Sequence, residues 1–234
     1  MLNSQTISDI VLQTAGLRRE YRLGKDTVTA LGGVDIQIKR GEFVAIMGPS
    51  GCGKSTLLNL LGGLDQPTAG TVTLDGNDLA DFDEEQLAKL RREKMGFVFQ
   101  RHDLFPVLTA RENIEFPMLL DGCAPELRRD QAANLLARVG LSDKADHLPD
   151  ELSGGQQQRI GLARSLANNP LILLADEPTG NLDSATAAEI MTMLIDLVRG
   201  AGLTLVMVTH DAESAERADR ILRLKDGQLI DGGP

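Results

Sequence analysis

The chain has 234 residues, 42% of them hydrophobic, which is enough apolar material for one large domain or two small lobes. Its formal net charge of −10 argues against a general binder of nucleic acid or anionic lipid, because both need basic protein surfaces. Only two cysteines occur, so neither a disulfide framework nor a metal-ligand spacing is expected.

Targeting and membrane-spanning segments are not expected either. The first residues lack the basic and hydrophobic parts of a secretion signal. No stretch approaches the ~18–20 apolar residues that a membrane span needs. We therefore expect a cytoplasmic protein that reaches a membrane only through a partner, with no direct membrane insertion and no binding of nucleic acid.

The N-terminal third of the chain has the patterns of β-structure. Residues 34–38 alternate apolar and polar side chains, as in a half-exposed strand. Residues 43–47 are an apolar run, which is typical of a strand covered on both faces. Residues 71–74, followed by an Asp-Gly pair, predict a further strand and turn.

A helix is predicted over residues 83–94, because Asp83 can cap it and Gln86 follows three residues later. A short strand over residues 96–99 then ends at Gln100. The predicted helix thus begins at the polar residue Asp83, and the predicted strand ends at the polar residue Gln100.

The segment that follows has helical rather than β patterns. Thr109 and Glu112 have the spacing of a capping box, and an amphipathic helix is predicted over residues 131–139. Residues 100–161 lack the Pro, Gly and Ser bias of a linker. We therefore expect a helical insert, residues 100–161, within a core made of residues 1–99 and 162–234.

The C-terminal part returns to alternating strands and helices. Strands are predicted over residues 171–175 and 203–209, with a helix between them over residues 184–199. Residues 221–224 and 228–230 flank an Asp-Gly pair and predict a closing hairpin. This alternation indicates an α/β fold with a mostly parallel sheet, whose ligands lie at the carboxyl ends of the strands.

Residues 48–56, GPSGCGKST, lie between a predicted strand and a predicted helix, which is the context of a phosphate-binding loop. The glycines let backbone N–H groups point at an anion, and the helix N-terminus carries partial positive charge. Lys54 adds a cation for the β- and γ-phosphates, and the Ser55 hydroxyl can coordinate Mg²⁺. Cys52 either fills a variable loop position or is a thiol activated by the helix terminus. The loop predicts binding of a nucleoside triphosphate.

Four further polar residues follow predicted strands and so fall at the same edge of the sheet: Gln100, Asp176, Glu177 and His210. Asp176 is the expected ligand of Mg²⁺, and Glu177 can polarise a water molecule beside the γ-phosphate. The alternative for these two acids is helix capping. His210 is either a core histidine or a polar contact of the γ-phosphate, and its position at the sheet edge favours the contact.

A second glycine-containing helix start occurs at residues 152–156, LSGGQ. Ser153 can cap a helix predicted over residues 157–167, and the two glycines expose backbone N–H groups to an anion. The alternative is an ordinary glycine-rich helix start. One chain with a single phosphate loop has no obvious use for a second one, but two copies related by a two-fold axis could each complete the site of the other.

Together, GPSGCGKST, Gln100, LSGGQ, ILLADEP at residues 172–178, residues 181–183 and His210 resemble the ATP-binding subunit of an ABC transporter over nearly the whole chain. The resemblance implies a P-loop NTPase fold of ABC type. Such a fold has a mostly parallel core, an N-terminal antiparallel β subdomain and a helical subdomain that carries LSGGQ. It also implies a head-to-tail homodimer that closes on two ATP molecules with Mg²⁺ and drives a membrane permease.

The resemblance further implies roles for individual residues. Glu177 is the general base, His210 contacts the γ-phosphate, and Gln100 takes part in catalysis and links to the membrane partner. Mg²⁺ is held by Ser55, Gln100 and Asp176, and Tyr21 stacks on adenine. ATP is bound within one chain by Gly48, Pro49, Ser50, Gly51, Cys52, Gly53, Lys54, Ser55 and Thr56, and across the dimer by Ser153, Gly154, Gly155, Gln156 and Asp183.

Within this family, residues 64–68, 96–100 and 108–113 are similar to the lipoprotein-releasing and macrolide-exporter branch, whose partners work by mechanotransmission. This implies a location at the cytoplasmic face of the inner or plasma membrane, held there by the permease. Two alternatives remain open at this point. One is a regulator of a cell-wall hydrolase in cell division, and the other is a soluble ABC ATPase of repair, translation or cluster assembly.

Overall fold

The computed structural model describes residues 9–24, 26–100 and 104–231 of the chain. Its central sheet has the strand order β10-β9-β3-β8-β7-β6, in which all neighbours pair in parallel except β9 and β10. The alternating pattern of the C-terminal part therefore predicted the right type of sheet. Its strands are β3 (Phe43–Met47), β6 (Met95–Val98), β7 (Ile172–Asp176), β8 (Thr204–Thr209), β9 (Arg220–Lys225) and β10 (Gln228–Asp231).

A second sheet is antiparallel and has the order β2-β1-β4-β5. Sequence patterns located only parts of it, because the ribbon of its two longest strands has register shifts, one of them between Thr14 and Leu17. Each shift interrupts the period of two that marks a strand. The strands are β1 (Ile10–Leu23), β2 (Asp26–Lys39), β4 (Ala69–Leu74) and β5 (Asn77–Asp78).

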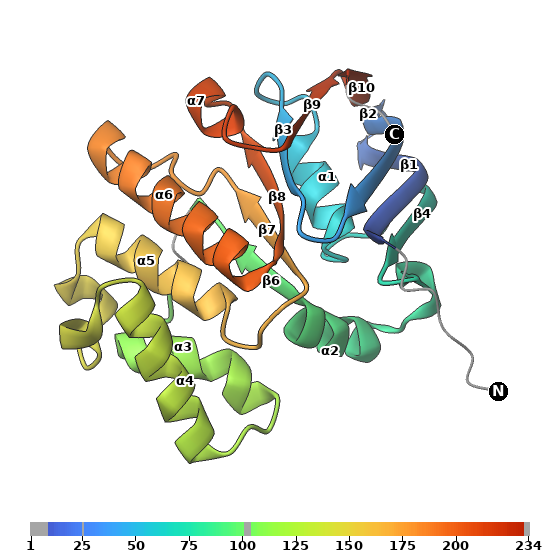
Figure 1. Cartoon of the computed structure of the whole chain (residues 1–234). Coiled ribbons are helices and arrows are strands. Elements are labelled where there is room, and N and C mark those ends of the chain that lie inside the picture. The colour runs from blue at the N-terminus through green and yellow to red at the C-terminus, as the bar shows by residue number, and fades with distance from the viewer. Residues whose placement is uncertain (1–8, 25, 101–103, 232–234) are drawn as a thin grey trace.

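The parallel sheet separates two hydrophobic cores, and β3 shows why its sequence is apolar throughout. Val44 and Ile46 enter a core shared with α1 and the antiparallel sheet, whereas Phe43 and Ala45 enter a core on the opposite face. Successive side chains of a strand point to opposite faces, so a strand between two cores needs no polar position. Figure 1 shows the antiparallel strands on one side of the parallel sheet and α5 and α6 on the other.

The helices around the core are α1 (Lys54–Leu61), α2 (Glu84–Lys94), α6 (Ser184–Ala201) and the single turn α7 (Ala212–Ala215). The capping box that predicted α2 is confirmed, since the side chains of Asp83 and Gln86 each accept a hydrogen bond from the other residue's backbone N–H. One face of α6 is buried, with the side chains of Ile190, Met191, Leu194, Ile195 and Val198. Within the described ranges, short 3-10 helices cover Leu79–Asp81, Ser142–Lys144 and Pro149–Glu151.

The predicted insert, residues 100–161, contains α3 (Ala110–Leu120), α4 (Pro125–Arg138) and the first part of α5 (Gly154–Ser165), and Figure 1 shows α3 and α4 at the lower left. The capping box of Thr109 and Glu112 is confirmed. The predicted start of α4 at residue 131 is wrong: the helix begins at Pro125, because proline suits a first turn and this turn is too polar to show periodicity. The predicted start of α5 at residue 157 is also wrong, since the helix follows its Ser153 cap directly.

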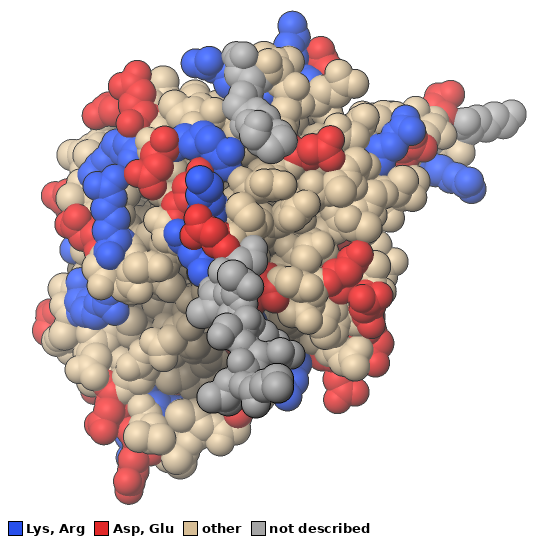
Figure 2. All heavy atoms as spheres, turned by 45° about the vertical axis from the view of Figure 1, so that its right-hand side comes forward, with Lys and Arg blue, Asp and Glu red and all other residues tan. Residues whose placement is uncertain are grey.

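The surface carries charges of both signs. Figure 2 shows Lys and Arg side chains interspersed with Asp and Glu side chains on the face it presents, rather than one continuous basic patch. Among the described residues, none of the helices combines the length and the apolar character required to span a bilayer.

Candidate active site

The phosphate loop connects β3 to α1, as its sequence predicted, and two of its glycines are fixed by close packing. A Cβ added at Gly48 would lie 2.1 Å from the carbonyl oxygen of Leu224, and one at Gly53 would lie 2.4 Å from that of Ala30. Gly53 is also the N-cap of α1, with a φ of 106° that side chains rarely adopt. The backbone can therefore run close to the neighbouring strands only because these positions are glycine.

Lys54, the first residue of α1, is buried, with 8% of its surface exposed. Its Nζ atom donates hydrogen bonds to the carbonyl oxygens of Gly48, at 2.8 Å, and of Pro49, at 3.0 Å. A buried ammonium group needs such partners, since burial without them is costly. The side chain therefore curls back over its own loop, where its charge faces any anion that the loop binds.

Asp176 ends β7 beside this loop. Burial raises the pKa of its carboxyl group, while a hydrogen bond with the Ser55 side chain and the nearby Lys54 charge act in the opposite direction. Its Oδ1 atom is buried and has no hydrogen-bond partner within the part of the chain that the structure describes. A carboxylate oxygen and a hydroxyl are ligands that Mg²⁺ prefers, so this pair of residues fits the metal.

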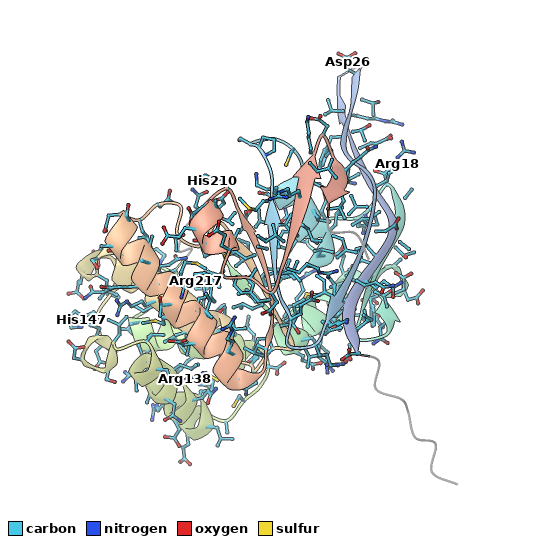
Figure 3. The ribbon with its side chains drawn as sticks, turned by 45° about the horizontal axis from the view of Figure 1, so that its top comes forward. Arg18, Asp26, Arg138, His147, His210 and Arg217 are labelled. Atoms are coloured by element: carbon cyan, nitrogen blue, oxygen red, sulfur yellow. The ribbon has the colours of Figure 1, made fainter. Side chains whose placement is uncertain are left out.

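Glu177 and His210 contact one another at the ends of β7 and β8. The Nδ1 atom of His210 lies 2.7 Å from Oε2 of Glu177. The Glu177 side chain is 17% exposed and that of His210 is 69% exposed. Both residues line a cavity of about 350 Å³, and Figure 3 shows His210 close to α7. The pair thus joins a mostly buried carboxylate to an exposed imidazole.

The backbone of Glu177 has a φ of 47°. Among the described residues other than glycine, only Asp75, Asn169 and Asp226 share a positive φ, and Asp and Asn tolerate this region far better than Glu. Strained residues of this kind cluster at functional sites, where the surrounding structure holds them. No sequence pattern predicts this conformation, because it arises from the turn after β7.

Gln100 is linked to the loop that follows β7. Its Nε2 atom donates to Oδ1 of Asn181 at 3.2 Å, and Nδ2 of Asn181 donates to the Gln100 carbonyl oxygen at 3.0 Å. Sequence reasoning missed Gln158, which is 1% exposed on α5 and donates to the carbonyl oxygens of Phe99, at 3.3 Å, and Pro178, at 2.5 Å. Its spacing of four from the apolar Leu162 was the signal that it faces inward.

Ser153 and Gln156 do not reach the phosphate loop of their own chain. They form a capping box at the start of α5, where the Ser153 N–H donates to Gln156 Oε1 at 2.9 Å and the Gln156 N–H donates to Ser153 Oγ at 3.3 Å. Gly154 follows on the surface, and Gly155 is half-buried. In Figure 1, α5 begins at the left of the view, whereas the loop before α1 is at the top.

Asp183 caps α6 at the same side of the molecule, where its Oδ1 atom accepts from the backbone N–H groups of Ala185 and Thr186 at 3.1 Å each. A hydrogen bond from the Thr186 hydroxyl is the main cause that lowers the pKa of Asp183. The cap leaves this carboxylate exposed.

Tyr21 lies on β1, in the antiparallel sheet. Its hydroxyl donates to Oδ2 of Asp65 at 2.8 Å, and the guanidinium carbon of Arg19 lies 4.6 Å from the ring centroid. The structure thus gives this tyrosine two charged neighbours that no sequence pattern predicted.

The fold and this geometry define an ATP-binding ATPase cassette, and the chain belongs to the ABC transporter family, which residues 31–180 match. Over 94% of its length, the chain is 44% identical to the uncharacterized ABC transporter ATP-binding protein YknY of Bacillus subtilis (strain 168), of which it covers 95%. It is 50% identical over 95% of its length to the macrolide export ATP-binding/permease protein MacB of Rhodopseudomonas palustris (strain BisB18). The chain spans 34% of that longer relative.

A solved structure with the same fold is described as a dimeric, post-hydrolysis state of the ATP-binding cassette MJ0796 bound to ADP and Pi. It is 46% identical to this chain, with a TM-score of 0.87, and the match covers 94% of this chain and 97% of that one. CbiO1 of Clostridium perfringens, described as part of an ABC transporter complex, has a TM-score of 0.86 at 31% identity, with 97% of this chain and 89% of that one covered. The predicted ABC-type P-loop fold is therefore confirmed.

Proposed function

We propose that the chain dimerises on two Mg-ATP and powers a separate membrane permease, in export or lipoprotein release by mechanotransmission. One observation carries this proposal: the phosphate loop, the Asp176 carboxylate and the Glu177–His210 pair lie at the carboxyl ends of β3, β7 and β8, which are neighbours in the parallel sheet. Ligands of such sheets bind at the carboxyl ends of the strands. A phosphate cradle, a metal ligand and a base meet there.

In this proposal the loop from Gly48 to Thr56 holds the phosphates, with the Lys54 ammonium facing the β- and γ-phosphates. Ser55, Gln100 and Asp176 hold Mg²⁺, which neutralises charge on the phosphates when it is bound. Glu177 accepts a proton from the attacking water as the oxygen–phosphorus bond forms, and ADP leaves with the electrons of the bond that breaks. His210 keeps the Glu177 carboxylate in place and contacts the γ-phosphate. Tyr21 stacks on the adenine.

A head-to-tail homodimer would complete the site. Ser153 and Gly154 are exposed and lie away from the phosphate loop of their own chain. We propose that they, with Gly155, Gln156 and Asp183, contact the ATP held by a second copy. The dimeric state described for MJ0796 supports this arrangement. The differential affinity of ATP for the closed dimer would then drive the partner.

The partner we propose is a membrane permease, with the chain at the cytoplasmic face of the membrane. The relative MacB combines an ATP-binding and a permease function in its name, and this chain matches about a third of it. We also propose that residues 100–161 act as the helical subdomain between the partner and the core made of residues 1–99 and 162–234. Gln100 is the first residue of this subdomain and would link it to the core through its hydrogen bonds with Asn181.

Replacing Glu177 with Gln tests the catalytic part of this proposal. Glu177→Gln keeps the shape of the side chain but cannot accept the proton, so hydrolysis should fall by roughly 10²- to 10⁴-fold while ATP binding persists. Phosphate release measures the loss of hydrolysis. Because the variant still binds ATP but does not hydrolyse it, it should stay an ATP-bound dimer, which size-exclusion chromatography with light scattering detects. Glu213→Gln is the matched control, because Glu213 lines the same cavity from α7. Unchanged hydrolysis by Glu177→Gln would refute its role as the base.

A further inference from the structure

Arg19, Tyr21 and Asp65 form a cluster in which only Tyr21 has a role in the proposed function. Arg19 and Tyr21 are alternate residues of β1 and so project from the same face of the strand. Asp65 comes from the segment after α1. Figure 3 labels Arg18 and Asp26, which mark the part of the β1–β2 ribbon to which Arg19 and Tyr21 belong.

Both oxygens of the Asp65 carboxylate are used. Oδ1 accepts from the Arg19 guanidinium at 2.7 Å and from the Gln66 N–H at 2.8 Å, while Oδ2 accepts from the Tyr21 hydroxyl at 2.8 Å. The Arg19 and Asp65 side chains are only 22% and 24% exposed, so solvent screens this ion pair less than an open surface pair. The carboxylate therefore holds two side chains of β1 in one arrangement.

The cluster fixes the Tyr21 ring in two ways. The hydrogen bond to Asp65 holds its hydroxyl end, and the Arg19 guanidinium lies against the ring at 4.6 Å from its centroid, within the range of a cation–π contact. Arginine stacks on aromatic rings in this way through its planar guanidinium. With Arg19 against one face, the opposite face is the one that a flat base can stack on.

Asp65 also connects this ring to the phosphate loop. The N–H groups of Leu64 and Asp65 donate to the carbonyl oxygen of Asn59 in α1, at 2.8 Å and 3.4 Å. The helix α1 begins at Lys54 in the phosphate loop and has eight residues, which corresponds to a length of about 12 Å. A rigid helix thus sets the separation between the phosphate loop and the residue that orients Tyr21.

We propose that Asp65 and Arg19 are positioning residues for the purine base of ATP. They hold Tyr21 at a fixed distance and orientation from the phosphate loop, so that base and phosphates engage together. The inference rests on the proposed role of Tyr21 in ATP binding. It predicts that the cluster matters for a ligand with a base and not for a polyphosphate without one.

The chain carries its own probe for this site, because Tyr21 is its only tyrosine and it has no tryptophan. Tyrosine emission therefore reports on Tyr21 alone. Stacking of adenine on the ring should quench this emission when ATP is added, whereas inorganic tripolyphosphate should leave it unchanged. Quenching of equal size by both ligands would show that the base does not reach the ring and would overturn the inference.

The kinetic test uses Asp65→Ala, with ATP as substrate and inorganic tripolyphosphate as a competitor. Stacking of a base on an aromatic ring contributes to affinity, so loss of the orientation should raise KM for ATP roughly tenfold while kcat stays within about twofold. The Ki of tripolyphosphate should not change. Asp65→Asn keeps an acceptor oxygen for the Tyr21 hydroxyl and should recover part of the KM, and Arg19→Gln should raise KM less than Asp65→Ala does.

Asp75→Ala is the matched control, because Asp75 is also a partly exposed aspartate paired with an arginine, Arg40, beside the antiparallel sheet. Its KM should equal that of the wild type. An equal rise in KM for ATP and in Ki for tripolyphosphate in Asp65→Ala would reveal a general structural defect and overturn the inference. If Tyr21→Ala leaves KM unchanged, the proposed adenine contact itself fails. If Tyr21→Ala raises KM but Asp65→Ala and Arg19→Gln do not, only the positioning role fails.

Discussion

The N-termini of α1 and α5 both have glycine beside the helix cap, but their structures differ. The glycines precede α1, whereas Gly154 and Gly155 are the first residues of α5. The first turn of any helix has N–H groups without an intrahelical partner. At α1 the cap is Gly53, which has no side chain to satisfy them. At α5 the cap is Ser153, whose hydroxyl accepts from the N–H of Gln156 in a closed capping box. One helix start is open to a ligand and the other is partly satisfied by its own chain.

The surroundings of the two helix starts also make the α1 terminus the one better suited to a ligand. The α1 terminus has the buried Lys54 and the half-buried Asp176 beside it, so one chain supplies both a cation and a carboxylate. At the α5 terminus, Ser153 and Gly154 are exposed. The difference supports the proposal that the first terminus is the main part of a site and that the second joins one only when a second copy covers it.

The largest expected effect on ATP hydrolysis comes from substitutions that change each of the two helix termini separately. Lys54→Ala removes the buried cation, and loss of such an electrostatic contact should lower ATP hydrolysis by ~10²–10³-fold. Ser153→Arg should also inactivate the dimer by blocking the second terminus. A random mixture of the two variants should regain about a quarter of the wild-type sites, since half of the dimers are mixed and each has one intact site. Phosphate release measures both effects, and Lys89→Ala on the surface of α2 is the control.

A smaller effect compares two capping boxes of the same chemistry. Ser153→Ala and Thr109→Ala each remove the hydroxyl that caps a helix, so each should lower the free energy of unfolding by about 1 kcal/mol. Only Ser153→Ala should lower ATP hydrolysis at a temperature where both variants are folded. Urea unfolding and steady-state hydrolysis check the two parts. Equal activities in the two variants would mean that the Ser153 box is structural only.

The smallest effect concerns a helix cap that titrates. Asp211 caps α7, and its hydrogen bonds with Ser214 are the main cause that lowers the pKa of its carboxyl group. The ionised cap therefore stabilises the fold fully above the unfolded-state pKa of about 4, and this contribution is lost as pH falls through the lower folded-state pKa. Asp211→Ser has an uncharged cap. The free-energy difference between wild type and variant, from urea unfolding, should be constant near neutral pH and shrink in acid; a difference that grows in acid would contradict this.

The parallel sheet could be predicted because its strands are buried on both faces and read as continuous apolar runs, as in residues 43–47. The antiparallel sheet could be predicted only in part, since the bulge between Thr14 and Leu17 breaks the period of two. The same contrast holds within the helices. Caps such as Asp83 and Thr109 are local and were predicted correctly, whereas the polar first turns of α4 carry no periodic signal.

In the candidate site, the residues that follow strands could be predicted from their positions alone, although their chemical roles stay predictions. The structure places Asp176 beside Ser55 and Glu177 beside His210. The contacts of Asp65 with Tyr21 could not be predicted, because they join positions 44 residues apart. The positive φ of Glu177 could not be predicted either, since it depends on the turn that the surrounding strands impose.

The insert shares its apolar interior with one face of the parallel sheet: Ile114 of α3, Leu135 of α4 and Ile160 of α5 belong to the same core as Phe43 and Leu205. The insert therefore has no separate hydrophobic core and should not unfold independently of the sheet. Heating should produce a single cooperative transition for sheet and insert together. Any tilt of the insert during a catalytic cycle must also shear this common interior, which limits the motion to small slides between packed helices.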